Sequence, residues 1–128
     1  MEKILVVDDS ELIRHMLTDL LSAEGYSVSS AADSAQAMAA IRKEVPALIF
    51  MDIMMPGMDG QLVTRLIKSD KKYEDIPIIV FSSLATDAHI QLSQKVGATV
   101  HMKKTTPPAE ILQTVRRLLD ERTASVGQ

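Results

Sequence analysis

Short apolar segments alternate with longer amphipathic segments along the chain, and this alternation restricts the fold more than any other feature of the sequence. Ile4–Val7, Ala47–Met51 and Ile76–Phe81 are almost uninterrupted apolar runs of strand length. A strand that is apolar on both faces has to be covered on both faces, as in a parallel sheet between two layers of helices. The sequence therefore predicts an α/β fold with a doubly wound parallel sheet.

Two further segments complete the strand pattern. Ser27–Ala31 is short and polar and is expected to be an edge strand, and Thr99–Lys103 is expected to be the last strand. Parallel neighbours need a crossover connection, which is usually a helix. The chain therefore predicts five strands and five helices, with helices on both faces of the sheet.

The helical segments carry apolar residues at intervals of three and four and have recognisable ends. Ser10 is placed to cap the first helix and Gly25 to end it. The last helix is expected to begin at Pro107 or Pro108 and to end at about Asp120. Between them, helices are expected from Asp33 or Ser34, after Gly60, and over about Thr86–Val96, where the apolar stripe is thin.

Length and composition limit the class of protein. The 128 residues suit one domain, expected over residues 1–122, with a flexible tail at 123–128. The absence of cysteine excludes disulfides and thiolate zinc sites, and a net charge of −3 argues against direct binding of nucleic acid. No signal peptide is evident, and no apolar stretch approaches the roughly 20 residues of a membrane helix. We therefore expect a cytoplasmic domain without membrane insertion.

Polar residues follow four of the predicted strands. The carboxyl ends of parallel strands meet at one edge of the sheet, where open α/β folds bind their ligands. Asp8 and Asp9 come directly after the first strand, and Asp52 comes directly after Ala47–Met51. The other two strands are followed by Ser82 and Ser83, and by Lys103 and Lys104.

This set of side chains suits the handling of a phosphoryl group. Three carboxylates close together repel one another, and a hard divalent cation that prefers oxygen ligands relieves the repulsion. An aspartate can itself be the nucleophile and form an aspartyl phosphate, with metal and lysine neutralising the charge. The pattern indicates a magnesium site, with manganese as the alternative metal, beside a phosphorylatable acid.

Four segments resemble the receiver domains of two-component response regulators, in order and over residues 3 to 120. The resemblance implies strand order 2-1-3-4-5 and a switch that turns over no metabolite. A histidine kinase or phosphotransfer protein would supply the phosphoryl group, and the last two helices with the last strand would contact an output protein. The segments are Val6-Val7-Asp8-Asp9-Ser10, Met51-Asp52 with Met55-Pro56-Gly57-Met58-Asp59-Gly60, Phe81-Ser82-Ser83, and Val96-Gly97-Ala98 leading to Lys104.

The resemblance also implies roles for the acids. Asp52 is the phosphoacceptor. Asp8, Asp9 and Asp52 hold the metal together with the backbone carbonyl of Met54. A purely structural role for Asp8 and Asp9 as acids near a helix N-terminus is the alternative.

Three further positions are expected to read the phosphoryl group. By resemblance, Ser82 is the hydroxyl that meets a phosphoryl oxygen and Lys104 is the lysine that pairs with it. Strand alternation lets only one of Lys103 and Lys104 face the site, and the spacing favours Lys104. His101 occupies a switch position where the family usually has Tyr or Phe, so we expect a readout that changes near neutral pH.

The chain also departs from the family around the site. Thr105 follows Lys104 where relatives usually have proline, and a cis bond there would cost about 2.5–4 kcal/mol. The bond is therefore either held cis or the loop takes a trans path that shifts Lys104. Met54 and Leu84 are apolar at positions that flank the approach of water, which predicts slow self-dephosphorylation.

Two other classes remain open from the sequence. An aspartyl-nucleophile phosphatase or phosphotransferase would need a second acid two residues after its nucleophile, whereas Asp8-Asp9 is followed by Ser10, and it would need a cap domain. The receiver could also be part of a larger chain, such as a chemotaxis adapter or a truncated transcription regulator.

Overall fold

The computed structural model describes residues 2–53, 60–83, 95 and 97–126, except for the side chains of residue 61 and residues 122–126. Its centre is a five-stranded sheet in the order β2-β1-β3-β4-β5, with every neighbouring pair parallel. The α/β class, the parallel sheet and the predicted strand order are therefore confirmed. The strands are β1 Lys3–Val7, β2 Ser27–Ala31, β3 Leu48–Met51, β4 Ile78–Ser82 and β5 Val100–Lys103.

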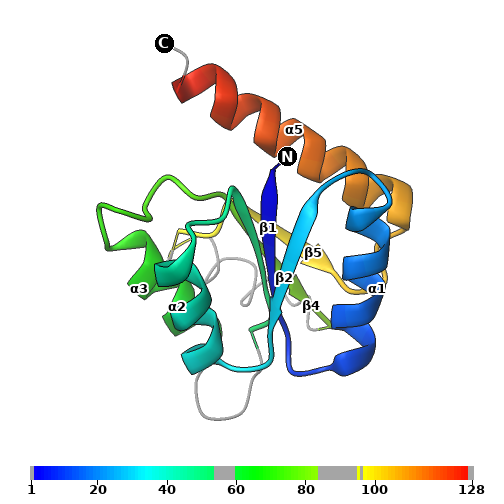
Figure 1. Cartoon of the computed structure of the whole chain (residues 1–128), viewed down its shortest axis with the longest axis horizontal. Coiled ribbons are helices and arrows are strands. Elements are labelled where there is room, and N and C mark those ends of the chain that lie inside the picture. Colours follow the sequence, from blue (N-terminus) through cyan, green and yellow to red (C-terminus); the bar gives the residue numbers. More distant parts are fainter. Residues whose placement is uncertain (1, 54–59, 84–94, 96, 127–128) are drawn as a thin grey trace.

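Four helices are present in the described part of the chain, and they form one layer on each face of the sheet. In Figure 1, α1 and α5 lie on one side of the strands and α2 and α3 on the other. The helix expected over about Thr86–Val96 lies, apart from Lys95, outside the described residues. The helices are α1 Glu11–Ser22, α2 Ser34–Lys43, α3 Gly60–Lys68 and α5 Pro108–Val126.

The two apolar layers explain why the strands are apolar on both faces. Ile4 and Val6 of β1 belong to the cluster that packs against α1 and α5. Leu5 and Val7 of the same strand belong to the cluster that packs against α2 and α3. Alternate residues of one strand thus enter opposite layers, as the two-residue period of a strand requires.

The predicted helix starts agree with the caps in the structure. The Ser10 hydroxyl oxygen accepts a hydrogen bond from the Ile13 amide at 3.3 Å, and an Asp33 carboxylate oxygen accepts one from the Gln36 amide at 2.8 Å. Gly25 follows α1 with a φ of 91°, a conformation that favours glycine. These local signals are therefore sufficient to place the beginnings of α1 and α2.

The start of β4 and the end of α5 differ from the expectation by two residues or more, while several other strand ends differ by one residue. The prediction that β4 starts at Ile76 is wrong, because the Ile76 amide bonds to the Tyr73 carbonyl in the preceding turn and Pro77 has no N–H to donate. The last helix does not end at about Asp120 but continues to Val126, into the segment expected to be a tail. The sequence between these two residues contains neither glycine nor proline, so nothing in it interrupts the helix.

No helix in the described ranges is both long enough and apolar enough to cross a membrane.

Candidate functional site

The sheet brings the predicted acids together at its carboxyl edge. Val7 is the register partner of Met51, so Asp8 and Asp52, the next residues in each strand, leave the sheet side by side. The Asp52 amide donates to the Val7 carbonyl at 2.9 Å, which continues the pairing of β1 and β3 to the site. Both acids are buried, with 2% of Asp8 and 3% of Asp52 exposed.

Asp9 completes an acidic cluster that opens to solvent. Asp8, Asp9 and Asp52 each contribute a carboxylate oxygen, and these oxygens lie within 4.8 Å of one another. Asp9 is exposed, whereas the other two acids are buried. Magnesium prefers oxygen ligands and binds through one or two carboxylates while retaining water, so this donor set fits it. The geometry is compatible with the predicted divalent cation.

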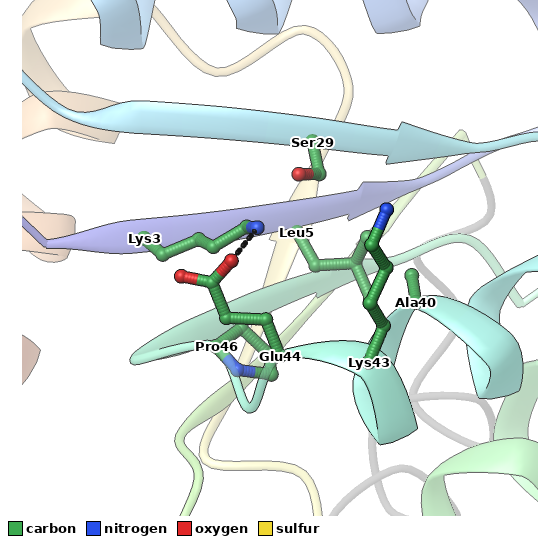
Figure 2. Close-up of a pocket in the computed structure, with 7 residues that line it drawn as sticks. All are labelled: Lys3, Leu5, Ser29, Ala40, Lys43, Glu44 and Pro46. Carbon is green, nitrogen blue, oxygen red and sulfur yellow. Dashed lines mark hydrogen bonds and ion pairs between the residues drawn. The ribbon is translucent and has the colours of Figure 1, made fainter.

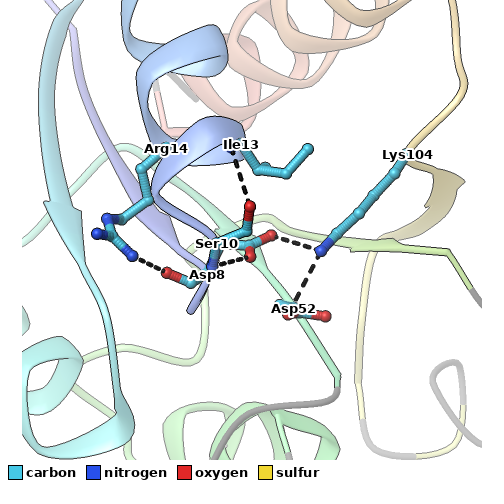
Figure 3. A network of polar contacts seen from close by, with 6 residues as sticks. All are labelled: Asp8, Ser10, Ile13, Arg14, Asp52 and Lys104. Carbon is cyan, nitrogen blue, oxygen red and sulfur yellow. Dashed lines mark hydrogen bonds and ion pairs between the residues drawn. The ribbon is translucent and has the colours of Figure 1, made fainter.

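Lys104 joins the two buried acids. Its Nζ lies 2.8 Å from Oδ2 of Asp8 and 3.4 Å from Oδ2 of Asp52 (Figure 3). Burial acts to lower the pKa of Lys104, but the hydrogen bond to Asp8 and the charge of Asp52 outweigh it and raise this pKa above 10.5. The ammonium is therefore protonated at neutral pH and compensates part of the negative charge.

The choice of Lys104 over Lys103 agrees with the structure. Lys103 is an exposed residue of β5, while Lys104 follows the strand and turns into the site. None of the peptide bonds in the described ranges is cis, so the chain takes a trans path from Lys104 to Thr105. Lys104 reaches both acids on this path.

Ser82 and His101 lie on the two strands nearest this edge. Ser82 is the buried last residue of β4, and its carbonyl accepts from the Lys104 amide at 2.9 Å. His101 is half-buried in β5 opposite Val80, further from the carboxyl edge than Lys103, which is opposite Ser82. Ser82 therefore lies at the site, and His101 lies below it in the last strand.

Two site residues were missed by reasoning from the sequence alone. Arg14 donates through Nη1 to the backbone carbonyl of Asp8 at 2.7 Å. Gly60, the first residue of α3, donates its amide to the Ile53 carbonyl at 3.1 Å and lies against the backbone of Asp52. Neither contact follows from spacing, although Gly60 belongs to the Met-Pro-Gly-x-Asp-Gly segment. Met54 and Leu84 lie outside the described residues.

A separate cavity lies near the amino ends of the strands. It has a volume of about 270 Å³ and is lined partly by Lys3, Leu5, Lys43 and Glu44 (Figure 2). The Lys3 ammonium and a Glu44 carboxylate oxygen pair across it at 2.5 Å. The cavity contains none of the three clustered acids, and we assign it no role in the acidic site.

Comparison with known proteins identifies the family. Residues 4–116 match the family model of the response regulator receiver domain, and the chain belongs to this family. Its members are signalling proteins and not classical enzymes, which disfavours the alternative of an aspartyl-nucleophile phosphatase or phosphotransferase. The resemblance noted from the motifs is thereby confirmed.

Two solved structures have folds similar to the fold of this chain. The chemotaxis protein CheY4 of Vibrio cholerae is 33% identical with a TM-score of 0.87, over 92% of this chain and 98% of that one. The BeF3-activated receiver domain of Klebsiella pneumoniae RstA is 32% identical with a TM-score of 0.85, over 91% of this chain and 97% of that one. The chain thus matches complete receiver domains.

Curated relatives are longer. The probable transcriptional regulator ycf27 of Pyropia yezoensis is 36% identical over 98% of this chain and 52% of its own length. The DNA-binding response regulator MtrA of Mycolicibacterium smegmatis is 33% identical over 92% of this chain and 50% of its own length. The chain spans about half the length of these relatives.

Proposed function

We propose that this receiver domain accepts a phosphoryl group on Asp52 and that the modification switches a protein-binding surface. The proposal depends mainly on one observation, the contact of the Lys104 ammonium with both Asp8 and Asp52 at the carboxyl edge of the sheet. A cation beside two buried carboxylates, with a third acid within 4.8 Å, neutralises the charge that a phosphoryl group brings.

Asp52 is the nucleophile in this proposal. A carboxylate oxygen of Asp52 forms a bond to phosphorus while the phosphorus–nitrogen bond of a phosphohistidine in the donor protein breaks. The electron pair of that bond stays on the imidazole nitrogen. Lys104 supports the step because its ammonium is protonated and lies 3.4 Å from the Asp52 carboxylate to which the phosphoryl group would be attached.

A divalent cation completes the charge balance. We assign its ligands to Asp8, Asp9, Asp52 and the backbone carbonyl of Met54, with magnesium as the physiological metal and manganese as a substitute. When bound, it supplies positive charge and orients the phosphoryl oxygens. The protein positions the acids: the strands hold them side by side, and Lys104 contacts Asp8 and Asp52.

The proposed output surface is formed by α5, β5 and the segment of about residues 86–96, for which we propose the fifth helix. Ser82 moves its hydroxyl to the phosphoryl group. His101, two residues before Lys103 in β5, changes its conformation in response and so alters this surface. We further propose that residues 1–122 suffice for phosphorylation, and that the segment 123–128 does not take part.

Regulation and partners extend this proposal. Apolar Met54 and Leu84 would leave attacking water unoriented, so the aspartyl phosphate would decay slowly. The donor is a histidine kinase or phosphotransfer protein in the cytoplasm, and the output is a protein partner rather than nucleic acid. The output belongs either to another protein or to a longer form of this chain, and the longer relatives are described as transcriptional regulators.

The test uses a small phosphodonor so that no partner protein is needed. Wild type, Asp52→Asn and the matched surface variant Asp70→Asn are incubated with acetyl phosphate and Mg²⁺, and hydroxylamine-labile phosphate is measured. We expect labelling of wild type and Asp70→Asn and none of Asp52→Asn. Labelling of Asp52→Asn would move the acceptor elsewhere, and an unlabelled wild type would refute the proposed function.

A further inference from the structure

Arg14 contacts the backbone between the two acids that follow β1. From the second turn of α1, its Nη1 reaches back and donates to the carbonyl oxygen of Asp8 at 2.7 Å (Figure 3). That oxygen belongs to the peptide group that joins Asp8 to Asp9. A hydrogen bond from a charged guanidinium is stronger than one between neutral groups, so it restrains the orientation of this peptide plane.

The other polar atoms of Asp8 are also held. Its amide donates to the Ala31 carbonyl at 3.1 Å, and its Oδ1 accepts from the Ser10 amide at 2.9 Å. Its Oδ2 contacts the Lys104 ammonium at 2.8 Å. Asp8 is thus fixed through its backbone and its side chain, and Arg14 provides the bond to its carbonyl.

The position of Asp9 depends more on the Arg14 hydrogen bond than the position of Asp8 does, because Asp8 has several other hydrogen bonds and contacts. Asp9 is exposed, so its backbone fixes the point and the direction in which the Cα–Cβ bond leaves the chain, and its χ angles set the rest of the side chain. We propose that Arg14 is a positioning residue for the divalent cation: by holding the Asp8–Asp9 peptide plane, it aims the Asp9 carboxylate at the oxygens of Asp8 and Asp52. This inference depends on the metal site described under the proposed function.

A purely electrostatic role for Arg14 predicts the opposite result. Arg14 is a cation bonded to the backbone of Asp8, so its removal would relieve repulsion of Mg²⁺ and strengthen the binding of Mg²⁺ if charge alone mattered. A positioning role predicts weaker binding, because partners that orient metal ligands typically contribute tenfold or more to affinity. The sign of the change therefore separates the two roles.

The experiment measures Mg²⁺ binding to the unphosphorylated protein by titration calorimetry. The variants are Arg14→Met, Arg14→Lys, and Arg42→Met, which makes the same charge change at an exposed position of α2. We expect Arg14→Met to weaken binding about tenfold, the low end for outer partners of a metal site. Arg14→Lys retains a charged donor, so its affinity for Mg²⁺ should be closer to that of wild type than the affinity of Arg14→Met is. Arg42→Met should bind Mg²⁺ as tightly as wild type.

A second readout separates positioning from damage to the fold. With acetyl phosphate as donor, Arg14→Met should raise the half-saturating Mg²⁺ concentration while the rate at saturating Mg²⁺ stays within about twofold of wild type. If Arg14→Met does not fold, Arg14→Gln, which also removes the charge, takes its place with the same expectation. Unchanged or tighter Mg²⁺ binding in the neutral variant would overturn the inference. Failure of wild type to bind Mg²⁺ would instead refute the proposed metal site itself.

Discussion

Gly60 packs so closely against Asp52 that a β-carbon on Gly60 would lie 1.8 Å from the Asp52 carbonyl oxygen and 2.7 Å from its carbonyl carbon. Both groups are backbone, so a side chain could not be accommodated by a change of rotamer. The amide of Gly60 also bonds to the Ile53 carbonyl, which joins the start of α3 to the end of β3. The position of Asp52, the proposed phosphoacceptor, therefore depends on the absence of a side chain at residue 60.

Gly60→Ala is expected to displace the backbone of Asp52. Overpacking of this kind costs about 1–3 kcal/mol of stability. Because the displaced residue is the proposed nucleophile, phosphorylation by acetyl phosphate should also slow by about 10-fold to 100-fold. The measurements are denaturant unfolding and the rate of labelling.

Gly25→Ala provides the matched control for this substitution. Gly25 has a φ of 91° and no atom within 4 Å of an added β-carbon, so alanine there is strained without touching the site. It should lose about 1–2 kcal/mol through its left-handed backbone but keep the labelling rate of wild type. Equal labelling rates in both variants would show that the contact between Gly60 and Asp52 has no role in the reaction.

The sheet and its acids could be predicted because both follow from short-range patterns. Apolar runs identify β1, β3 and β4, and the residues directly after a strand lie at its carboxyl edge whatever the rest of the fold does. The contacts of Arg14 and Gly60 could not be predicted in this way. Arg14 reaches back to Asp8 across the helix cap, and Gly60 contacts the backbone of Asp52, a residue that is not its neighbour in the sequence.

The end of α5 was misjudged for a different reason. Most residues after Asp120 are polar, which is typical of a tail, but a helix that projects beyond its packing partners can also be polar. In Figure 1 the last turns of α5 extend past the sheet. Nothing in the sequence up to Val126 interrupts the helix, because the next glycine after Asp120 is residue 127.

Removal of the Lys104 charge should destabilise the metal-free protein. Lys104→Met leaves the carboxylates of Asp8 and Asp52 without their shared cation, and the loss of a charged partner from a buried group costs about 1–3 kcal/mol. Addition of Mg²⁺ should therefore stabilise Lys104→Met more than wild type. Thermal unfolding with and without Mg²⁺ measures this, with exposed Lys103→Met as the control. Equal stabilisation of all three proteins by Mg²⁺ would contradict the proposed sharing of charge.

The same ion pair predicts a loss of stability at alkaline pH. The pKa of Lys104 is raised in the folded state by its contacts with Asp8 and Asp52, despite the opposing effect of burial. Its stabilising contribution is therefore complete below the ordinary pKa of 10.5 and is lost as the pH rises through the higher folded value. The difference in unfolding free energy between wild type and Lys104→Met should be constant from about pH 7 to 9 and shrink above 10.5. A difference that stays constant through the alkaline range would exclude the ion pair as its source.

An exposed apolar pair on α1 predicts where a protein donor makes contact. Leu12 is 78% exposed and Met16 is 37% exposed, one turn apart on the helix that starts directly beyond the acidic site. A donor that brings phosphohistidine to Asp52 has to lie over the start of α1, and burial of Leu12 would contribute to the stability of the complex. Leu12→Gln should therefore slow transfer from a phosphorylated protein donor by about fivefold or more.

The comparison with a small donor makes this prediction specific. Acetyl phosphate needs no docking surface, so Leu12→Gln should be labelled by it at the wild-type rate. Val45→Gln, which changes a residue that is 49% exposed just before β3 at the opposite edge of the sheet, should leave both rates unchanged. Unimpaired transfer to Leu12→Gln from a cognate kinase would place the docking surface elsewhere, whereas a parallel loss with acetyl phosphate would indicate damage to the site, because α1 also carries the Arg14 contact to Asp8.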